Sequence, residues 1–208
     1  SNMAGRNRII NGNMVIDQRN AGAASTNNIN GYLLDRWQVI QTAIQGKVIA
    51  QQNAGSLNAS NRPAGFTNYL GVTSQSAYSI TSNDNFSVLQ QIEGFNVADL
   101  GWGTANAQTI TLSFWVRSSL TGVFGGAFSN AGVTRSYPFN YTISSANTWE
   151  LKAVTVAGDT SGTWAADNTS GIRVWFGLGA GANLSGTAGA WASADYRSAT
   201  GATSVVGT

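Results

Sequence analysis

The stretch "TITLSFWVRS", residues 109–118, alternates apolar and polar side chains along its whole length. Successive side chains of a β-strand point to opposite faces, so this period of two predicts a half-buried strand. One face carries Ile110, Leu112, Phe114 and Val116. We expect these four side chains to be nearly free of solvent contact in the core of a two-layer sheet structure.

Two further stretches repeat this plan. In "IRVWFGL", residues 172–178, the apolar positions lie on one face and Arg173 and Trp175 lie on the other. The inward residues are Ile172, Val174, Phe176 and Leu178. In "YPFNYTI", residues 137–143, every second residue is aromatic or aliphatic. Pro138 has no N–H for a neighbouring strand, which predicts an edge strand or a bulge there.

Weaker alternation predicts more strands, separated by stretches rich in Gly, Asn and Ser that are typical of turns. These strands are 34–40, 46–52, 69–77, 86–92, 122–128 and 149–156. Helical periodicity is nearly absent, and no linker divides the chain. The sequence therefore predicts a single all-β domain with almost no helix, either a sandwich or a barrel.

The composition excludes several classes of protein. The chain has 208 residues and a net charge of +2, but only 10% of its residues are charged. It has no run of Lys or Arg, which disfavours nucleic-acid binding, and no apolar run long enough to insert into a membrane. It has no His and no Cys, which removes a Ser-His-Asp triad, thiolate chemistry and His- or Cys-ligated zinc. The low charge favours a protein that works outside a cell or within a larger assembly.

Carboxylates are the remaining candidates for catalysis. Glu93 and Asp99 lie close together in "QIEGFNVADLGWG", followed by Trp102. A glycoside hydrolase needs two such acids across a sugar, and Asp84 is a further candidate. The favoured interpretation is that Glu93 and Asp99 hold a turn or pair with an arginine.

Two acidic loops could bind a structural Ca²⁺ ion. Asp159 and the pair Asp167-Asn168 lie in loops rich in Gly, Ser and Thr. They lack the spacing of a calcium-binding loop of the EF-hand type, so a role in turns is favoured. No other cofactor is expected.

Trp115 and Trp175 lie on the polar faces of their strands, and Arg117 and Arg173 follow the same faces. An exposed indole can stack on the C–H face of a sugar while a guanidinium donates to its hydroxyls. If the two strands are neighbours, these four residues predict a glycan-binding platform, and Trp102 is a further candidate. A second buried layer or a subunit interface is the alternative.

Three ordered motifs carry a resemblance to a known family. They are "NRIINGNMVIDQRNAG" (7–22), "GYLLDRWQV" (31–39) and the segment 90–122 that contains "TITLSFWVRS". Together they resemble the jelly-roll domain of bacteriophage tail fibres and related virion appendages. That domain is similar to carbohydrate-binding modules of the galactose-binding type, and the match reaches to about "AWASADY" (190–196).

The resemblance implies a non-catalytic protein with an antiparallel jelly-roll sandwich. It further implies receptor recognition on a host-surface glycan, a homotrimer, contacts with other tail proteins, and a place in the virion after synthesis in the host cytoplasm. Two alternatives stay open. One is a purely structural virion module that mediates contacts between subunits. The other is a glycan-modifying hydrolase that uses Glu93, Asp99 or Asp84.

The start of the chain carries three further expectations. Ser1 and Asn2 are typical of a tag remnant, and Met3 is typical of a start of the chain, which leaves 4–208 as the domain. The stretch 8–22 is expected to begin with a strand that packs Ile10, Met14 and Ile16, with a turn or bulge at Asn11-Gly12-Asn13. Ion pairs are expected among four charged residues of the first two motifs. These residues are Asp17, Arg19, Asp35 and Arg36.

The family typically continues beyond the Ala- and Ser-rich tail with one more strand. The sequence as given has no segment of that type before Thr208. The resemblance therefore implies a sandwich without its final strand, which would leave an unpaired sheet edge.

Overall fold

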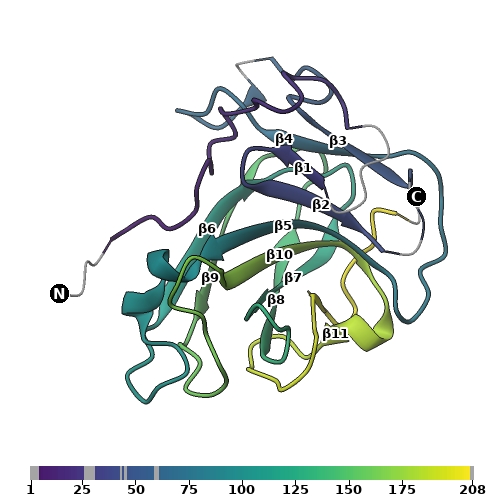
Figure 1. Cartoon of the computed structure of the whole chain (residues 1–208). Helices are drawn as coiled ribbons and strands as arrows, with labels where there is room; N and C mark the ends of the chain where they lie inside the picture. Colours follow the sequence, from purple (N-terminus) through teal and green to yellow (C-terminus); the bar gives the residue numbers. More distant parts are fainter. Residues whose placement is uncertain (1–4, 26–30, 43, 45, 59–60, 207–208) are drawn as a thin grey trace.

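The structure is a computed structural model that describes residues 5–25, 31–42, 44, 46–58 and 61–206. It is built from antiparallel β-sheets, with one short parallel pair, and its described helices are three-residue 3₁₀ turns (Figure 1). The longer strands are β1 (Gly31–Leu34), β2 (Trp37–Gln41), β3 (Val48–Gln52), β4 (Leu70–Ser74), β5 (Asn85–Glu93), β6 (Ile110–Val116), β7 (Gly122–Ser129), β8 (Ser136–Ile143), β9 (Glu150–Val156) and β10 (Ser170–Ala180). The short elements are β11 (Ser185–Gly186), β12 (Ser198–Ala199), η2 (Gly94–Asn96), η3 (Ala98–Leu100) and η4 (Ala182–Leu184). The predicted all-β class is confirmed, and every strand predicted from alternation between residues 34 and 178 has a counterpart.

A six-stranded sheet forms the larger layer. Its order is β1-β2-β5-β10-β7-β8, and every pair within it is antiparallel. Strand β8, which contains Pro138, lies at the edge of this sheet, as its sequence predicts. Strand β1 is the one strand of the sheet that the sequence did not predict, because its four residues are too few to show a period.

Two separate two-stranded sheets, β3–β4 and β6–β9, form the second layer. They pack against the same face of the six-stranded sheet. One apolar cluster joins Leu112 and Val156 of β6–β9 to Ile172 and Val174 of β10. A second cluster joins Val48 and Ala50 of β3 to strands β2 and β5.

The faces of β6 and β10 alternate as predicted, but their burial is uneven. Leu112 and Val174 are buried, which confirms the expectation for these two. The other four tested side chains are only half-buried, so the expectation of near-complete burial is wrong for them. They are Ile110, Phe114, Val116 and Phe176. The last three line an opening in the second layer that is described below.

The stretch 8–22 is fastened by side chains and does not form a strand. The side chain of Gln90, which is fully buried in β5, accepts from the backbone N–H of Ile10 and donates to its carbonyl, both at 2.9 Å. The expected turn is present, since residues 10–13 form one and Asn11 has a φ of 53°. The expected first strand is wrong, because Ile10 and Ile16 remain exposed.

The ion pairs expected within the first two motifs are also wrong. Asp17 accepts hydrogen bonds from the backbone of Asn20 and Gly22, and Asp35 accepts one from Gln18. Two arginines find other partners: Arg19 lies over the ring of Tyr32, and Arg36 pairs with Glu93. Sequence proximity suggested the partners, but each short carboxylate is satisfied by the nearest backbone N–H groups.

The segment 182–202 lies on the outer face of the six-stranded sheet (Figure 1). Glycines in β7 and β10 allow this close approach. A Cβ atom at Gly125 or Gly177 would lie 2.5 or 2.7 Å from the hydroxyl oxygen of Ser198. The outer face therefore has a cover of its own, which the alternation of β10 alone could not show.

Candidate functional site

The predicted platform of Trp115 and Trp175 does not form. Strand β6 pairs with β9, whereas β10 pairs with β5 and β7, so the two indoles lie in different sheets. Trp175 is 3% exposed, donates from Nε1 to the hydroxyl of Ser129, and has the Arg197 guanidinium 5.1 Å from its ring centre. The alternative of a second buried layer therefore holds for Trp175.

Arg173 lies beside Trp175 on this covered face. Its Nε donates to the side chain of Gln91 at 3.1 Å. Burial, followed by the nearby charge of Arg197, lowers the pKa of the Arg173 guanidinium. Arg173 is thus part of the packing under segment 182–202 and not of an open platform.

Trp102 is a core residue. Its indole is buried and lies edge-on to the rings of Trp164 and Trp191, with centroid distances of 4.8 and 5.3 Å. Its Nε1 donates to the carbonyl of Gln108 at 2.8 Å. A sugar could not stack on Trp102 as expected, because its indole is covered by the rings of Trp164 and Trp191.

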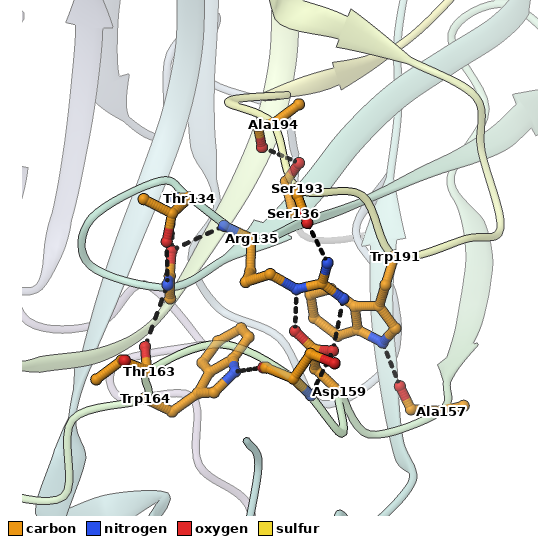
Figure 2. A network of polar contacts seen from close by, with 12 residues as sticks. Thr134, Arg135, Ser136, Ala157, Asp159, Thr163, Trp164, Trp191, Ser193 and Ala194 are labelled. Carbon is orange, nitrogen blue, oxygen red and sulfur yellow. Dashed lines mark hydrogen bonds and ion pairs between the residues drawn. The ribbon is translucent and has the colours of Figure 1, made fainter. Parts of the chain in front are cut away.

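An ion pair lies against this tryptophan cluster (Figure 2). Arg135 makes two parallel hydrogen bonds of 2.7 Å to the carboxylate of Asp159, whose side chain is 2% exposed. Arg135 also donates to Ser193, and Trp191 donates to the carbonyl of Ala157 (Figure 2). The hydrogen bonds join the β7–β8 loop, the loop after β9 and the C-terminal segment at one end of the fold.

The carboxylates that could have bound Ca²⁺ have protein partners. Asp159 pairs with Arg135, and Asp167 accepts from the backbone and hydroxyl of Thr169. The predicted turn role is confirmed for Asp167. Among the residues that the structure describes, no group of three acidic side chains is placed to hold a metal ion.

The three acids considered for catalysis are engaged in structural contacts. Asp99 forms two hydrogen bonds of 2.6 and 2.7 Å with Arg8, and Glu93 pairs with Arg36. Asp84 is buried and accepts from the hydroxyl of Tyr78 and the N–H of Thr81. The favoured interpretation, that Glu93 and Asp99 pair with arginines, is confirmed.

These ion pairs predict sensitivity to acid. Hydrogen bonds from Arg36 and Arg8 lower the pKa values of Glu93 and Asp99 below their usual 4.5 and 3.8. Their contribution is therefore complete above about pH 5 and is lost as the pH falls through the lowered pKa values. Because both pairs are partly exposed, we expect each to contribute less than about 1 kcal/mol.

The measurement is the melting temperature between pH 7 and pH 3, as approximate bounds. In the double variant Glu93→Gln, Asp99→Asn the decline towards low pH should be shallower than in the unaltered protein. Ser145→Ala is a neutral surface control and should leave the decline unchanged. An identical decline in the double variant would show that other groups control the acid response.

A large opening, the β4–β6 cleft, lies between the two small sheets of the second layer. Its volume is about 1120 Å³, and its floor consists of apolar side chains from the inner face of the six-stranded sheet, including Trp37, Val88 and Phe176. Its described lining contains two charged residues, Arg62 and Arg117, and no carboxylate. Sequence reasoning missed Arg62, because the loop "ASNRPAG" shows no pattern that separates it from other turns.

A smaller polar hollow, the rim pocket, adjoins the cleft and has a volume of about 360 Å³. Its residues are Asn61, Arg62, Pro63, Arg117, Asn147, Thr148 and Trp149. Arg117 donates from Nε to the carbonyl of Asn147 at 2.9 Å, and Arg62 donates to the carbonyls of Leu57 and Thr67. Neither arginine has an ion-pair partner among the described residues, so the rim pocket carries uncompensated positive charge.

Trp115 lies next to the rim pocket. It shares a strand face with Arg117, also lines the β4–β6 cleft, and is 40% exposed. Its cross-strand neighbour is Leu151, which is exposed as well. Of the two tryptophan–arginine pairs that the sequence singled out, only Trp115 and Arg117 are thus accessible.

No protein-family model matches this chain, and a search of curated proteins finds no significant relative. Within the described part of the chain, no helix has the length and apolar character needed to cross a membrane.

Proposed function

We propose that the protein is a non-catalytic glycan-binding module and that Trp115 and the rim pocket form its binding site. The observation that carries this proposal is an exposed indole beside two arginines that lack acidic partners. A sugar ring can stack on Trp115, and the guanidinium and amide groups of the rim pocket can donate to its oxygens. Neither terminal nitrogen of Arg117 has a hydrogen-bond partner among the described residues.

Binding is favoured over hydrolysis by the chemistry of the site. A glycoside hydrolase holds two carboxylates across the scissile bond. The described lining of the cleft and of the rim pocket contains no Asp or Glu. Glu93 and Asp99, the best candidates for such a pair, are occupied by Arg36 and Arg8.

The wider proposal follows the resemblance of the three sequence motifs. We propose a jelly-roll domain of a phage tail fibre or similar virion appendage that recognises a glycan on the host surface. A homotrimer would link several weak sites and raise their combined affinity. A structural role in contacts between virion subunits is the second candidate. It is favoured by the outer edges of β4 and β6, which have no strand partner within the described residues.

The test is a glycan array probed with the intact assembled protein, followed by titration of the best ligand. Trp115→Ala should weaken binding by at least about 10-fold, which corresponds to the loss of one stacking contact. Arg117→Gln should also weaken binding. Both variants should melt within about 2 °C of the unaltered protein, since Trp115 is exposed and Arg117 is only half-buried, so neither replacement leaves a core cavity.

Phe95→Ala is the matched control, because Phe95 is an aromatic residue that is 67% exposed and lies outside both openings. It should bind the ligand normally. If Trp115→Ala binds as well as Phe95→Ala, the site lies elsewhere. If no glycan binds to the assembled protein, the structural role becomes the better account.

A further inference from the structure

The rim pocket combines two positive charges with no negative one. Its described lining includes Arg62 and Arg117, and its other members are neutral. The acid next to it in the sequence, Glu150, pairs with Lys152 and accepts from two backbone N–H groups. Four arginines elsewhere in the described chain do pair with carboxylates. They are Arg8, Arg36, Arg135 and Arg197.

Arg117 presents one free edge of its guanidinium. Its Nε donates to the carbonyl of Asn147 at 2.9 Å, and the backbone N–H of Asn147 donates to the carbonyl of Ser118 at 2.7 Å. These bonds fasten the β8–β9 loop to the end of β6 and leave both terminal nitrogens of Arg117 without a partner among the described residues. The two terminal nitrogens of a guanidinium lie in one plane and can donate in parallel to both oxygens of a carboxylate.

Arg62 supplies the second charge and is held in place by neutral groups. Its Nε and one terminal nitrogen donate to the carbonyl of Leu57 at 3.0 and 2.7 Å, and the other terminal nitrogen donates to the carbonyl of Thr67. The guanidinium also lies 5.6 Å from the ring centre of Tyr69. These contacts orient the Arg62 guanidinium without neutralising it, so its charge acts on whatever occupies the rim pocket.

The two charges favour an anionic ligand over a neutral one. Arg62 and Arg117 are both half-buried, so water screens their mutual repulsion less completely than at an open surface. A neutral sugar offers only hydroxyl acceptors and leaves both charges uncompensated. A carboxylate neutralises charge, and its hydrogen bonds to a guanidinium are roughly twice as strong as those between neutral groups.

We propose that the rim pocket selects acidic sugars. The carboxylate of a uronic or sialic acid unit binds the free edge of Arg117 and is attracted by Arg62, while Trp115 stacks on the ring of that sugar or of the next one. The pocket volume of about 360 Å³ lies near the lower end of the range of about 300–1,000 Å³ for ligand sites, which suits a single charged ring. This inference rests on the proposed function, since it names the class of sugar that the same site takes.

A carboxylate fits the site better than a sulfate or phosphate group. The free edge of Arg117 offers two donors in one plane, which matches the two oxygens of a carboxylate. A tetrahedral anion has a further acceptor oxygen outside that plane, which needs a donor of its own.

The test uses the intact assembled protein and pairs of saccharides that differ only in charge. The acidic members are oligogalacturonate, hyaluronan oligosaccharides and sialyllactose, and they are also included in the glycan array. Each neutral partner is the same saccharide with its carboxylates reduced to primary alcohols, so rings and linkages are unchanged. Lactose sulfate represents a tetrahedral anion. Dissociation constants are measured by isothermal titration calorimetry at about 50 and 300 mM salt.

We expect the acidic member of at least one pair to bind at least about 10-fold more tightly than its reduced partner. Higher salt should narrow this difference, because dissolved ions screen the guanidinium charges. In Arg117→Gln the two members should bind within about two-fold of each other, because the planar charged fork is gone. Trp115→Ala should weaken both members and keep the difference, since stacking does not depend on the carboxylate.

Arg6→Gln is the matched control. Arg6 is exposed and lies outside both openings, and its replacement changes the net charge by the same amount as Arg117→Gln. This variant should keep the preference for the acidic member. Loss of the preference in Arg6→Gln would mean that overall charge attracts the ligand, which would overturn the proposal. Arg62 is left unaltered, because its bonds to Leu57 and Thr67 also hold its own loop.

The outcomes separate this inference from the proposed function. If the best ligand of the array is neutral, or if both members of every pair bind equally and through Trp115, the glycan site stands and its selection of acidic sugars is wrong. Tighter binding of lactose sulfate than of sialyllactose would overturn the assignment of a carboxylate. If no glycan binds, the proposed function and this inference are both wrong.

Discussion

Replacing Trp175 with alanine is expected to lower the free energy of unfolding by about 3–5 kcal/mol. The indole is 3% exposed and packs with Ile40, Leu89 and Ala127 on the outer face of the six-stranded sheet. Its removal leaves a cavity under segment 182–202. It also takes away the donor to the Ser129 hydroxyl and the ring beneath the Arg197 guanidinium.

Trp115→Ala is the matched comparison, since it changes the same residue type on the outward face of another strand. Trp115 is 40% exposed, and we expect its replacement to cost less than about 0.5 kcal/mol. Urea unfolding of the two variants, followed by circular dichroism, measures both values. If Trp175→Ala were as stable as Trp115→Ala, segment 182–202 could not be packed over Trp175 in solution.

This pair of tryptophans shows what alternation in a sequence can predict. The period of two assigned the faces of β6 and β10 correctly, because side-chain direction in a strand is a local property. It could not assign what lies over each face. Cover of the outer face depends on the segment 182–202, which is far from β7 in the sequence and shows little periodicity of its own. Glycines such as Gly125, which permit the close approach, are indistinguishable in the sequence from the many turn glycines.

The candidate site was only partly predictable for a related reason. Trp115 and Arg117 are neighbours on one strand face, so the sequence could pair them. Arg62 and Trp149 also line the site, but each is dozens of residues from Arg117 in the sequence. The packing of the two small sheets that brings these residues together is not encoded in any short motif. The same holds for Arg36 and Glu93, which pair across 57 positions.

The incomplete burial of Phe114, Val116 and Phe176 carries different information. Their apolar character indicates a core, and the structure places them on core faces but leaves them half-buried beside the β4–β6 cleft. Sequence and structure disagree here because the second layer is open at this point.

Replacing Arg135 with methionine is also expected to lower the free energy of unfolding by about 3–5 kcal/mol. Methionine retains much of the side-chain volume but removes both hydrogen bonds to Asp159, whose side chain is 2% exposed. An ionised carboxylate would then lie in the core beside Trp164 without a counter-charge. The desolvation of such an unpaired charge dominates the cost.

The variant Arg135→Lys separates charge from geometry. Lysine keeps the positive charge but cannot reproduce the two parallel bonds of the guanidinium. We expect it to cost clearly less than the methionine, about 1–2 kcal/mol. Both variants should shift the tryptophan fluorescence towards longer wavelengths, because Trp164 and Trp191 lie at this network and would gain contact with water (Figure 2).

The double variant Arg135→Met, Asp159→Asn decides whether the loss of stability in Arg135→Met arises from the buried Asp159 carboxylate that is left without an ion-pair partner. If it does, neutralising Asp159 should restore about half or more of the stability that Arg135→Met loses, so the two changes would be strongly non-additive. The amide can still accept the hydrogen bond that the backbone N–H of Ser161 donates to Asp159. Additive losses in the double variant would mean that Arg135 acts through its packing and its bond to Ser193, and that the buried charge is not the reason why these loops need an arginine.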